Sequence, residues 1–226
     1  MKAAAYVLTR NYYRIALPSI KSLLVHSDVD KIYILCEDDE LPFGLPKTEA
    51  VNVSGMDLFD PDGPNYSGTR FSHAVLFKAA VHKIFPELDK ILIIDADTIC
   101  VEDVSELWDI PLDDCYYAGA KEPTKSKGGI WEQEDLYINA GVMMANLEKL
   151  RDGTGDRILH RLNTEQFVFC EQDCINNECQ GGILEIDSCY NANSFTAEAA
   201  QPKILHSAAI DGWFNFPIVQ LYDSIQ

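Results

Sequence analysis

One segment near the middle of the chain constrains the fold more than any other: Lys90–Ile94, whose residues KILII carry no polar side chain after the lysine. Such an unbroken apolar run is typical of a central strand that is covered by helices on both faces. The run leads directly into Asp95-Ala96-Asp97. Because open α/β sheets bind ligands at the carboxyl ends of their strands, the sequence predicts a ligand site at these two aspartates.

The rest of the chain alternates predicted strands with predicted helices, as expected of an α/β fold with a mostly parallel sheet and helices on both faces. Further strands are predicted at residues 3–8, 31–36, 50–53, 116–120, 141–145, 183–186 and 203–206. Helices are predicted at residues 15–26, 72–85, 154–167 and 172–178, and residues 57–68 are predicted to form a loop. No linker or internal repeat divides the 226 residues, so we expect one domain over residues 1–226.

Charge and hydropathy limit the classes of partner. A formal net charge of −18 opposes nucleic-acid binding, which relies on Lys and Arg to neutralise phosphates. A small phosphorylated ligand stays compatible with this charge if a bound cation holds it. The apolar runs are far shorter than the roughly 20 residues of a membrane-spanning helix, and the amino terminus lacks a complete signal peptide, so we expect a cytoplasmic protein without a membrane span.

The cysteines predict thiols rather than disulfides. Their number, seven, is odd, and they are spread along a chain without a secretory signal. Cys170, Cys174, Cys179 and Cys189 form a cluster that suggests a metal site, but it lacks the paired C-x-x-C spacing of structural zinc sites. Free, buried thiols are therefore the favoured interpretation.

The D-x-D pattern favours a divalent cation. Asp95 and Asp97 can both reach one hard cation and still leave coordination positions for substrate phosphates. A turn that uses Asp would explain the pattern by itself. However, two carboxylates at the edge of an apolar core are costly unless they have partners, which favours the cation.

Four segments together resemble the glycogenin-like family 8 glycosyltransferases. They are KILIIDADTICVEDVSELWDI (residues 90–110), YINAGVMMANLEKLR (137–151), EQD (171–173) and, weakly, YVLTRNYY (6–13), in the family's order. That family consists of retaining enzymes with a GT-A, Rossmann-like fold and a manganese-bridged UDP-sugar donor. The resemblance implies transfer of a hexose, glucose or galactose, from a UDP-sugar to an acceptor hydroxyl in glycan or polysaccharide synthesis.

The resemblance also implies which side chains would bind the cation and the diphosphate. Asp95, Asp97 and His206 would hold Mn²⁺ or Mg²⁺, since imidazole can join carboxylates around manganese. Lys78, which precedes the D-x-D strand, would contact the donor diphosphate. The family usually carries a further lysine after the histidine, and residues 207–213 contain none, so one diphosphate contact is in question.

The nucleotide and sugar contacts follow from the same resemblance. Tyr12 would stack on uracil, although Tyr13 could do so by a one-residue shift. A turn built from Thr-Arg-Asn would need no function at all. Gly141 is interpreted as a close-packing residue. The remaining donor contacts would be Thr9, Asn11, Ala96, Asn139 and Ala140, with Asn139 at the transferred sugar.

The reacting carbon would lie near Glu171 and Gln172, which match an Asp-Gln pair of the family. The first position is Glu here, and its extra methylene would displace the carboxylate and affect its positioning role. We favour front-side attack, with Gln172 supporting the face of the sugar as it becomes oxocarbenium-like. Double displacement through Glu171 is the alternative.

Two other functions fit part of the sequence. Haloacid-dehalogenase-like phosphatases also place D-x-D after an apolar strand and would use Asp95 as nucleophile, but Ile99 stands where they usually carry Thr or Val. A sugar-nucleotide-binding homologue with impaired catalysis would account for the missing lysine and for Glu171. The acceptor, whether a glycan, a lipid-linked sugar or a protein, is not identified by the sequence.

Overall fold

The computed structural model describes all residues except 68–72, 123–135, 195, 197, 209–211 and 226. Within this part of the chain, a seven-stranded sheet has the order β3-β2-β1-β4-β7-β6-β8. Its strands are β1 (Ala3–Val7), β2 (Lys31–Cys36), β3 (Thr48–Asn52), β4 (Lys90–Ile94), β6 (Tyr117–Lys121), β7 (Ile138–Asn146) and β8 (Ile183–Ile186). All neighbouring pairs are parallel except the two made by β7, which confirms the predicted mostly parallel α/β sheet.

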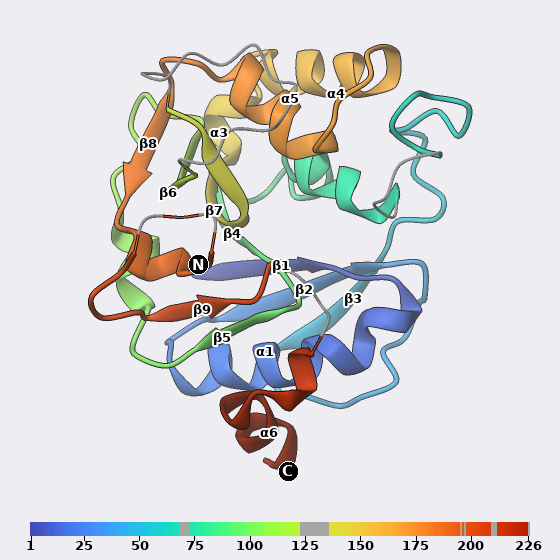
Figure 1. Cartoon of the computed structure of the whole chain (residues 1–226). Helices are drawn as coiled ribbons and strands as arrows, with labels where there is room; N and C mark the ends of the chain where they lie inside the picture. The colour runs from blue at the N-terminus through green and yellow to red at the C-terminus, as the bar shows by residue number, and fades with distance from the viewer. Residues whose placement is uncertain (68–72, 123–135, 195, 197, 209–211, 226) are drawn as a thin grey trace.

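Helices cover both faces of this sheet (Figure 1). On one side lie α1 (Tyr13–Val25) and α6 (Pro217–Ser224), and on the other α3 (Leu147–Leu150), α4 (Thr154–Thr164) and α5 (Cys170–Glu178). The short α2 (Val81–Ile84) belongs to the second group and packs with α3. Short 3₁₀ helices complete the described chain: η1 (Arg10–Tyr12), η2 (His73–Ala80), η3 (Ser105–Asp109), η4 (Ser188–Asn191) and η5 (Trp213–Asn215).

Strand β4 is buried on both faces, as its sequence predicts. Ile91 and Ile93 join the apolar cluster beneath α4 and α5, whereas Leu92 and Ile94 join the cluster that includes α1. All four side chains are at most 1% exposed. Because successive side chains of a strand point to opposite faces, only an unbroken apolar run can satisfy both clusters.

Strand β7 runs antiparallel to both of its neighbours. Its first residues therefore lie at the edge of the sheet where β4 ends, which is the edge predicted to bind a ligand. It pairs antiparallel with β4, with Ile94 opposite Val142, and the backbone N–H of Asp95 donates to the carbonyl of Gly141 at 2.8 Å. The start of β7 therefore lies beside the end of β4. The predicted strand over residues 141–145 omitted this start, since the observed strand begins at Ile138.

A second, two-stranded sheet carries the end of the chain to the same edge. It pairs β5 (Thr98–Cys100) antiparallel with β9 (Ile204–His206), and Thr98 lies opposite His206. The backbone N–H of Ser207 also donates to the carbonyl of Asp97 at 2.9 Å. This pairing explains how a histidine near the end of the chain reaches the D-x-D segment.

The helix predicted over residues 72–85 is wrong in type for most of its length. Residue 72 lies outside the described residues, residues 73–80 form the 3₁₀ helix η2, and only Val81–Ile84 is α-helical. The apolar spacing of so short a segment does not separate 3.6 from 3.0 residues per turn. The predicted loop is seen over residues 57–67, and residue 68 is not described.

Two predictions from composition can be compared with the structure. All seven cysteines are free, which confirms the predicted thiols. Cys170, Cys174 and Cys179 are buried in the apolar cluster beneath α4 and α5. Among the described helices, none has the length and apolar character required to cross a membrane.

Candidate active site

Three side chains with metal-binding atoms converge where β4 ends. One ligand atom from each of Asp95, Asp97 and His206 lies within 4.8 Å of the others. The His206 Nε2 atom is 3.4 Å from Asp97 Oδ1 and 3.9 Å from Asp95 Oδ2. Two carboxylates and an imidazole form a donor set that suits Mn²⁺, and hard oxygen ligands also suit Mg²⁺. The residues predicted from the sequence to bind the cation are therefore brought together and fit it.

Local hydrogen bonds hold the two aspartates in place. The Thr98 hydroxyl donates to the backbone carbonyl of Asp95 at 2.8 Å, which closes the turn after β4. The same hydroxyl lies 2.8 Å from the hydroxyl of Ser19 on α1. The turn is thus attached to a buried helix, and the carboxylates stand on a rigid support.

Asp95, one of the three residues of the candidate metal site, also contacts a buried lysine. Lys78 Nζ lies 2.6 Å from Asp95 Oδ1 and 3.4 Å from Glu171 Oε1, and the lysine is 5% exposed. Burial alone would lower the pKa of Lys78, but Asp95 and Glu171 outweigh it and raise the pKa above its ordinary value. The predicted lysine therefore carries a positive charge inside the site, where a diphosphate would need one.

The electrostatics of Asp97 and Glu171 differ. Burial tends to raise the pKa of Asp97, but contact with His206, and to a lesser degree the charge of Lys78, lowers it below its usual range. Burial raises the pKa of Glu171 to about 7, against the opposing effect of Lys78. The carboxylate form of Asp97 is thus stabilised, whereas that of Glu171 is destabilised by burial.

The backbone just before Glu171 is strained. Cys170 has a φ of 40°, in the left-handed region that residues other than glycine rarely adopt. Cys170 is the first residue of α5 and directly precedes the two predicted catalytic residues. Its conformation sets the direction from which α5 presents them to the site.

Gln172 is held by hydrogen bonds at both ends of its amide. Its Oε1 atom accepts from the backbone N–H of Ala140 at 2.8 Å. Its Nε2 atom donates to Glu122 Oε2 at 3.1 Å and to the Tyr137 hydroxyl at 3.0 Å. That hydroxyl in turn donates to Asp173 Oδ1 at 2.7 Å, so it can only accept from Gln172. The amide orientation of Gln172 is therefore determined by its partners.

The segment Asn139-Ala140-Gly141 connects these parts. The Asn139 Nδ2 atom donates to Glu122 Oε2 at 2.8 Å, and its Oδ1 atom accepts from the backbone N–H of Gly141 at 2.9 Å. The carbonyl of Ala140 accepts from Lys78 Nζ at 3.4 Å. This segment of β7 thus contacts Glu122 and Gln172 as well as Lys78.

Gly141 is required for the position of His206. A Cβ atom at Gly141 would lie 2.2 Å from His206 Cε1 and 2.6 Å from His206 Nδ1. The imidazole therefore packs directly on the backbone of β7. The structure supports the interpretation of Gly141 as a close-packing residue and shows what it packs against.

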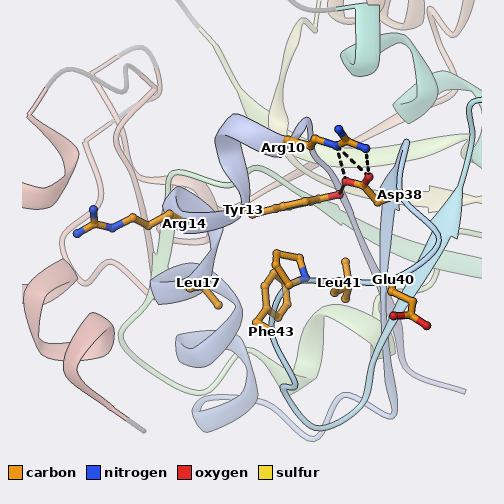
Figure 2. Close-up of a pocket in the computed structure, with 9 residues that line it drawn as sticks. Arg10, Tyr13, Arg14, Leu17, Asp38, Glu40, Leu41 and Phe43 are labelled. Carbon is orange, nitrogen blue, oxygen red and sulfur yellow. Dashed lines mark hydrogen bonds and ion pairs between the residues drawn. The ribbon is translucent and has the colours of Figure 1, made fainter.

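Residues 9–13, which the resemblance assigns to the nucleotide and which we call the nucleotide loop, present one of two tyrosines to the carboxylates. The Tyr12 ring is half-buried, and Asp97 and Asp95 contribute to the raised pKa of Tyr12 after burial. Tyr13 instead points to the other side of η1, where its hydroxyl donates to Asp38 Oδ2 at 2.8 Å (Figure 2). Of the two alternatives, the geometry thus favours Tyr12 as the residue that faces the site.

Tyr13 lines a shallow groove of about 760 Å³ between α1 and residues 38–43. Figure 2 shows Arg10 and Tyr13 converging on Asp38 at one end of this groove, with Phe43 and Leu17 below them. The ring of Tyr13 meets Phe43 edge-on, with centroids 6.2 Å apart. None of Asp95, Asp97 and His206 lines this groove.

Comparison with known proteins decides the family. The model for glycosyl transferase family 8 matches residues 3–208 of the chain. The chain belongs to glycosyltransferase family 8. The resemblance seen in the sequence is thereby confirmed.

Relatives of this family 8 protein are distant. A Haemophilus influenzae protein assigned as a glycosyltransferase is 25% identical over 158 residues, which are 65% of this chain and 48% of that protein. The chain spans about half or less of the length of the curated relatives it matches. Its activity, substrates and partners are therefore matters for proposal.

Solved structures show the same fold. The galactosyltransferase LgtC, in complex with donor and acceptor sugar analogues, superposes with a TM-score of 0.78 at 16% identity and covers 99% of this chain and 96% of its own. The glycosyltransferase GlyE of Streptococcus pneumoniae TIGR4 has a TM-score of 0.72 at 20% identity, over 100% of this chain and 60% of its own. These likenesses establish the GT-A fold of the family 8 chain.

The remaining predicted residues lie around the site with fewer contacts. Ala96 is buried between the two aspartates and packs into the cluster that includes α1. Thr9 precedes η1, and its carbonyl accepts from the backbone N–H of Tyr12 at 2.9 Å. Asn11 is exposed. Residues 209–211, within the segment that lacks the family's lysine, lie outside the described residues.

Sequence reasoning missed four polar residues that this family 8 site contains. Glu122, Tyr137 and Asp173 surround Gln172, and Asn191 contacts His206. Glu122 directly follows β6, which runs parallel to β8 and in the same direction as β4, so the strand-end rule would have found it once that direction was known. Asn191 ends η4, five residues after β8, and no motif indicates its role.

Proposed function

We propose that this chain is a metal-dependent retaining glycosyltransferase that moves a hexose from a UDP-sugar donor to an acceptor hydroxyl. The observation that carries the proposal is the convergence of Asp95, Asp97 and His206 beside the buried, positively charged Lys78. A donor diphosphate would otherwise meet a strongly acidic protein, with a net charge of −18. Family membership supports glycosyl transfer, and the fold of LgtC supports a galactose or glucose donor as the first to test.

The cation, held by Asp95, Asp97 and His206, would supply positive charge that offsets the charge of the departing nucleotide diphosphate. Lys78 would add a second positive charge on the same side of the donor. Tyr12 would stack on the base, and Thr9, Asn11 and Ala96 would be further donor contacts. Asn139 and Ala140 would hold the transferred sugar at the start of β7.

Two features favour front-side attack over double displacement. The Glu171 carboxylate lies 3.4 Å from Lys78 Nζ, and burial raises its pKa to about 7. A protonated or ion-paired carboxyl group is a weak nucleophile. Gln172 has a fixed amide orientation, and its oxygen, which accepts one hydrogen bond, has a second lone pair to face developing positive charge.

A screen of nucleotide-sugar hydrolysis tests this proposal directly. UDP-glucose and UDP-galactose would be incubated with the protein and Mn²⁺, Mg²⁺ or a chelator, and release of UDP would be measured. The proposal predicts turnover of at least one donor that requires the cation. Absence of turnover for any nucleotide sugar, with normal binding of UDP and Mn²⁺, would contradict it.

A second candidate function is sugar-nucleotide binding without efficient transfer. It is favoured by one observation, the absence of lysine from residues 207–213. The same screen separates the two functions because a binding protein would retain donor affinity without releasing UDP. The phosphatase alternative would hydrolyse simple phosphate esters instead, and the family match is to glycosyltransferases rather than to phosphatases.

A further inference from the structure

We propose that Asn191 is a positioning residue for His206, because it holds a proton on Nδ1 and so leaves the Nε2 atom to bind the cation between Asp95 and Asp97. The inference rests on the metal-binding part of the proposed function. It concerns a residue at the end of η4 that no sequence motif indicates.

The contact between the two side chains is short and buried. His206 Nδ1 lies 2.8 Å from Asn191 Oδ1, and Asn191 is 0% exposed. An amide oxygen only accepts hydrogen bonds, so a ring nitrogen at this distance carries the proton. The assignment of the proton therefore depends on which atom of the Asn191 amide faces His206, the oxygen or the nitrogen.

Hydrogen bonds that start from the backbone of β7 fix the orientation of the Asn191 amide. The N–H of Gly141 can only donate, and it donates to Asn139 at 2.9 Å, so the atom there is Asn139 Oδ1. That oxygen also contacts the Asn191 amide at 2.9 Å, where it must accept, which identifies Asn191 Nδ2. The other end of the Asn191 amide is consequently Oδ1, and it faces His206.

A second asparagine near the ring does not compete for Nδ1. Asn193 Nδ2 is 3.3 Å from His206 Nδ1 but lies closer to two acceptors, the Asn191 carbonyl at 3.1 Å and Asn191 Oδ1 at 3.0 Å. Its orientation is fixed as well, because the backbone N–H of Thr196 donates to Asn193 Oδ1 at 3.0 Å. Both amide hydrogens of Asn193 therefore have nearer partners than the imidazole.

Histidines that bind metals commonly donate their other N–H to a fixed acceptor, which sets the tautomer and the direction of the ring. Asn191 supplies that acceptor here. The same chain of hydrogen bonds continues through Asn139 to Glu122 and on to Gln172. The orientation of the metal-binding imidazole and that of the Gln172 amide are thus fixed by one network that includes the backbone of β7.

Three variants test the role of Asn191 through Mn²⁺ binding measured by calorimetry or electron paramagnetic resonance. Asn191→Leu keeps the volume but removes the acceptor, and should raise the Mn²⁺ dissociation constant by about 10- to 100-fold, the usual loss for such a partner of a metal ligand. Asn191→Asp keeps an acceptor and should retain most of the affinity. Asn65→Leu is the control, because Asn65 is 1% exposed and its side chain bonds, among the described residues, to the 162–167 segment alone.

Nitrogen-15 NMR of the histidine rings gives a readout that activity does not affect. The wild-type His206 ring should carry a proton on Nδ1, with or without Mg²⁺, because the atom that faces Nδ1 only accepts hydrogen bonds. The signal is assigned by its loss in His206→Gln among the five histidines. In Asn191→Leu the nearest group to Nδ1 becomes the Asn193 donor, so the proton should move to Nε2.

A wild-type ring with its proton on Nε2 alone would overturn the inference, as would unchanged Mn²⁺ affinity in Asn191→Leu. An Asn65→Leu protein that loses as much affinity as Asn191→Leu would also overturn it, since general destabilisation would then explain the result. Failure of the proposed function looks different. In that case Mn²⁺ binding and the Nδ1 proton would persist while no UDP-sugar is turned over.

Discussion

Two buried histidines in this protein pack on glycine backbone in the same way, yet their surroundings differ. A Cβ atom at Gly141 would lie 2.2 Å from the ring of His206, and one at Gly155 would lie 2.4 Å from the ring of His82. His206 has Asn191 at one ring nitrogen and two aspartates at the other. Among the described residues, neither ring nitrogen of His82 makes a hydrogen bond, although the ring is only 2% exposed.

The comparison shows that burial and close packing do not by themselves identify a functional histidine. His82 is a residue of α2, its ring packs against Gly155 of α4, and its Nε2 atom lies 4.0 Å from Asp156 Oδ1. Burial, followed by the charge of Lys83, lowers the pKa of His82 below its usual value. The ring is therefore a neutral packing element, whereas the partners of His206 direct its nitrogen at a site. Changes near His206 should alter chemistry, and changes near His82 should alter stability.

The largest effect is expected from Gln172→Ala, because Gln172 belongs to the hydrogen-bond network that reaches His206. Turnover of the donor should fall by about 10- to 10³-fold, the range for removing one well-placed polar group near developing charge. KM should change little, because binding rests on the cation, Lys78 and the nucleotide loop. Steady-state kinetics with a UDP-sugar checks this. A raised KM at unchanged kcat would place Gln172 away from the reacting carbon.

Glu171→Gln distinguishes the two transfer mechanisms. Front-side attack needs no carboxylate nucleophile, so the variant should keep measurable turnover and lose less than Gln172→Ala. Lys78 then has one carboxylate partner, Asp95, in place of two. Single-turnover kinetics would show the result. Near-complete loss of transfer, with intact donor binding, would point to a covalent route through Glu171.

A pair of glycine substitutions tests the comparison itself. Gly141→Ala and Gly155→Ala each force a methyl group into a histidine ring, and overpacking of this kind costs about 1–3 kcal/mol of stability. Only Gly141→Ala should also weaken Mn²⁺ binding, by an order of magnitude or more, since it displaces His206. Gly155 lies within α4, where the better helix propensity of alanine should offset part of its cost.

Thermal unfolding and Mn²⁺ titration of both glycine variants give the answer. Equal loss of metal affinity in the two would mean that the site responds to general destabilisation. Unchanged affinity in Gly141→Ala would mean that His206 does not need its observed position to bind the cation.

The smallest effect is expected at His82 and depends on pH. Because its pKa is lower in the folded protein than in the unfolded chain, the folded state binds fewer protons, and stability falls as pH drops below about 6.5. One such group contributes a slope of at most about 1.4 kcal/mol per pH unit. His82→Leu should remove this slope without affecting donor turnover. Denaturant unfolding of both proteins between neutral and mildly acidic pH would show an unchanged slope if the argument is wrong.

The sequence predicted the parts of the fold that depend on local patterns. The apolar run of β4 predicted a buried central strand, which the structure contains. The aspartates that follow the run predicted a ligand site at the end of this strand. The family resemblance then placed Lys78, His206 and the Asn139 segment near them. These residues depend on strand ends and motifs, which a single sequence displays.

The parts that could not be predicted arise from contacts between distant segments. Strand β5 has three residues and exists through its pairing with β9, so no local pattern marks it. The antiparallel direction of β7 is likewise set by its neighbours. Asn191 and Glu122 take their roles from the atoms they face, and neither stands in a recognisable motif. Polar partners of this kind are visible only in three dimensions.

The central claim is that Asp95, Asp97 and His206 form a cation site that holds a nucleotide diphosphate. Calorimetric titration of UDP in the presence of Mn²⁺ tests it in the wild type, in Asp97→Ala and in Asp62→Ala, an exposed aspartate that controls for the change of charge. We expect the wild type and Asp62→Ala to bind UDP only when Mn²⁺ is present and Asp97→Ala to lose this binding. Equal Mn²⁺-dependent affinity in Asp97→Ala would contradict it.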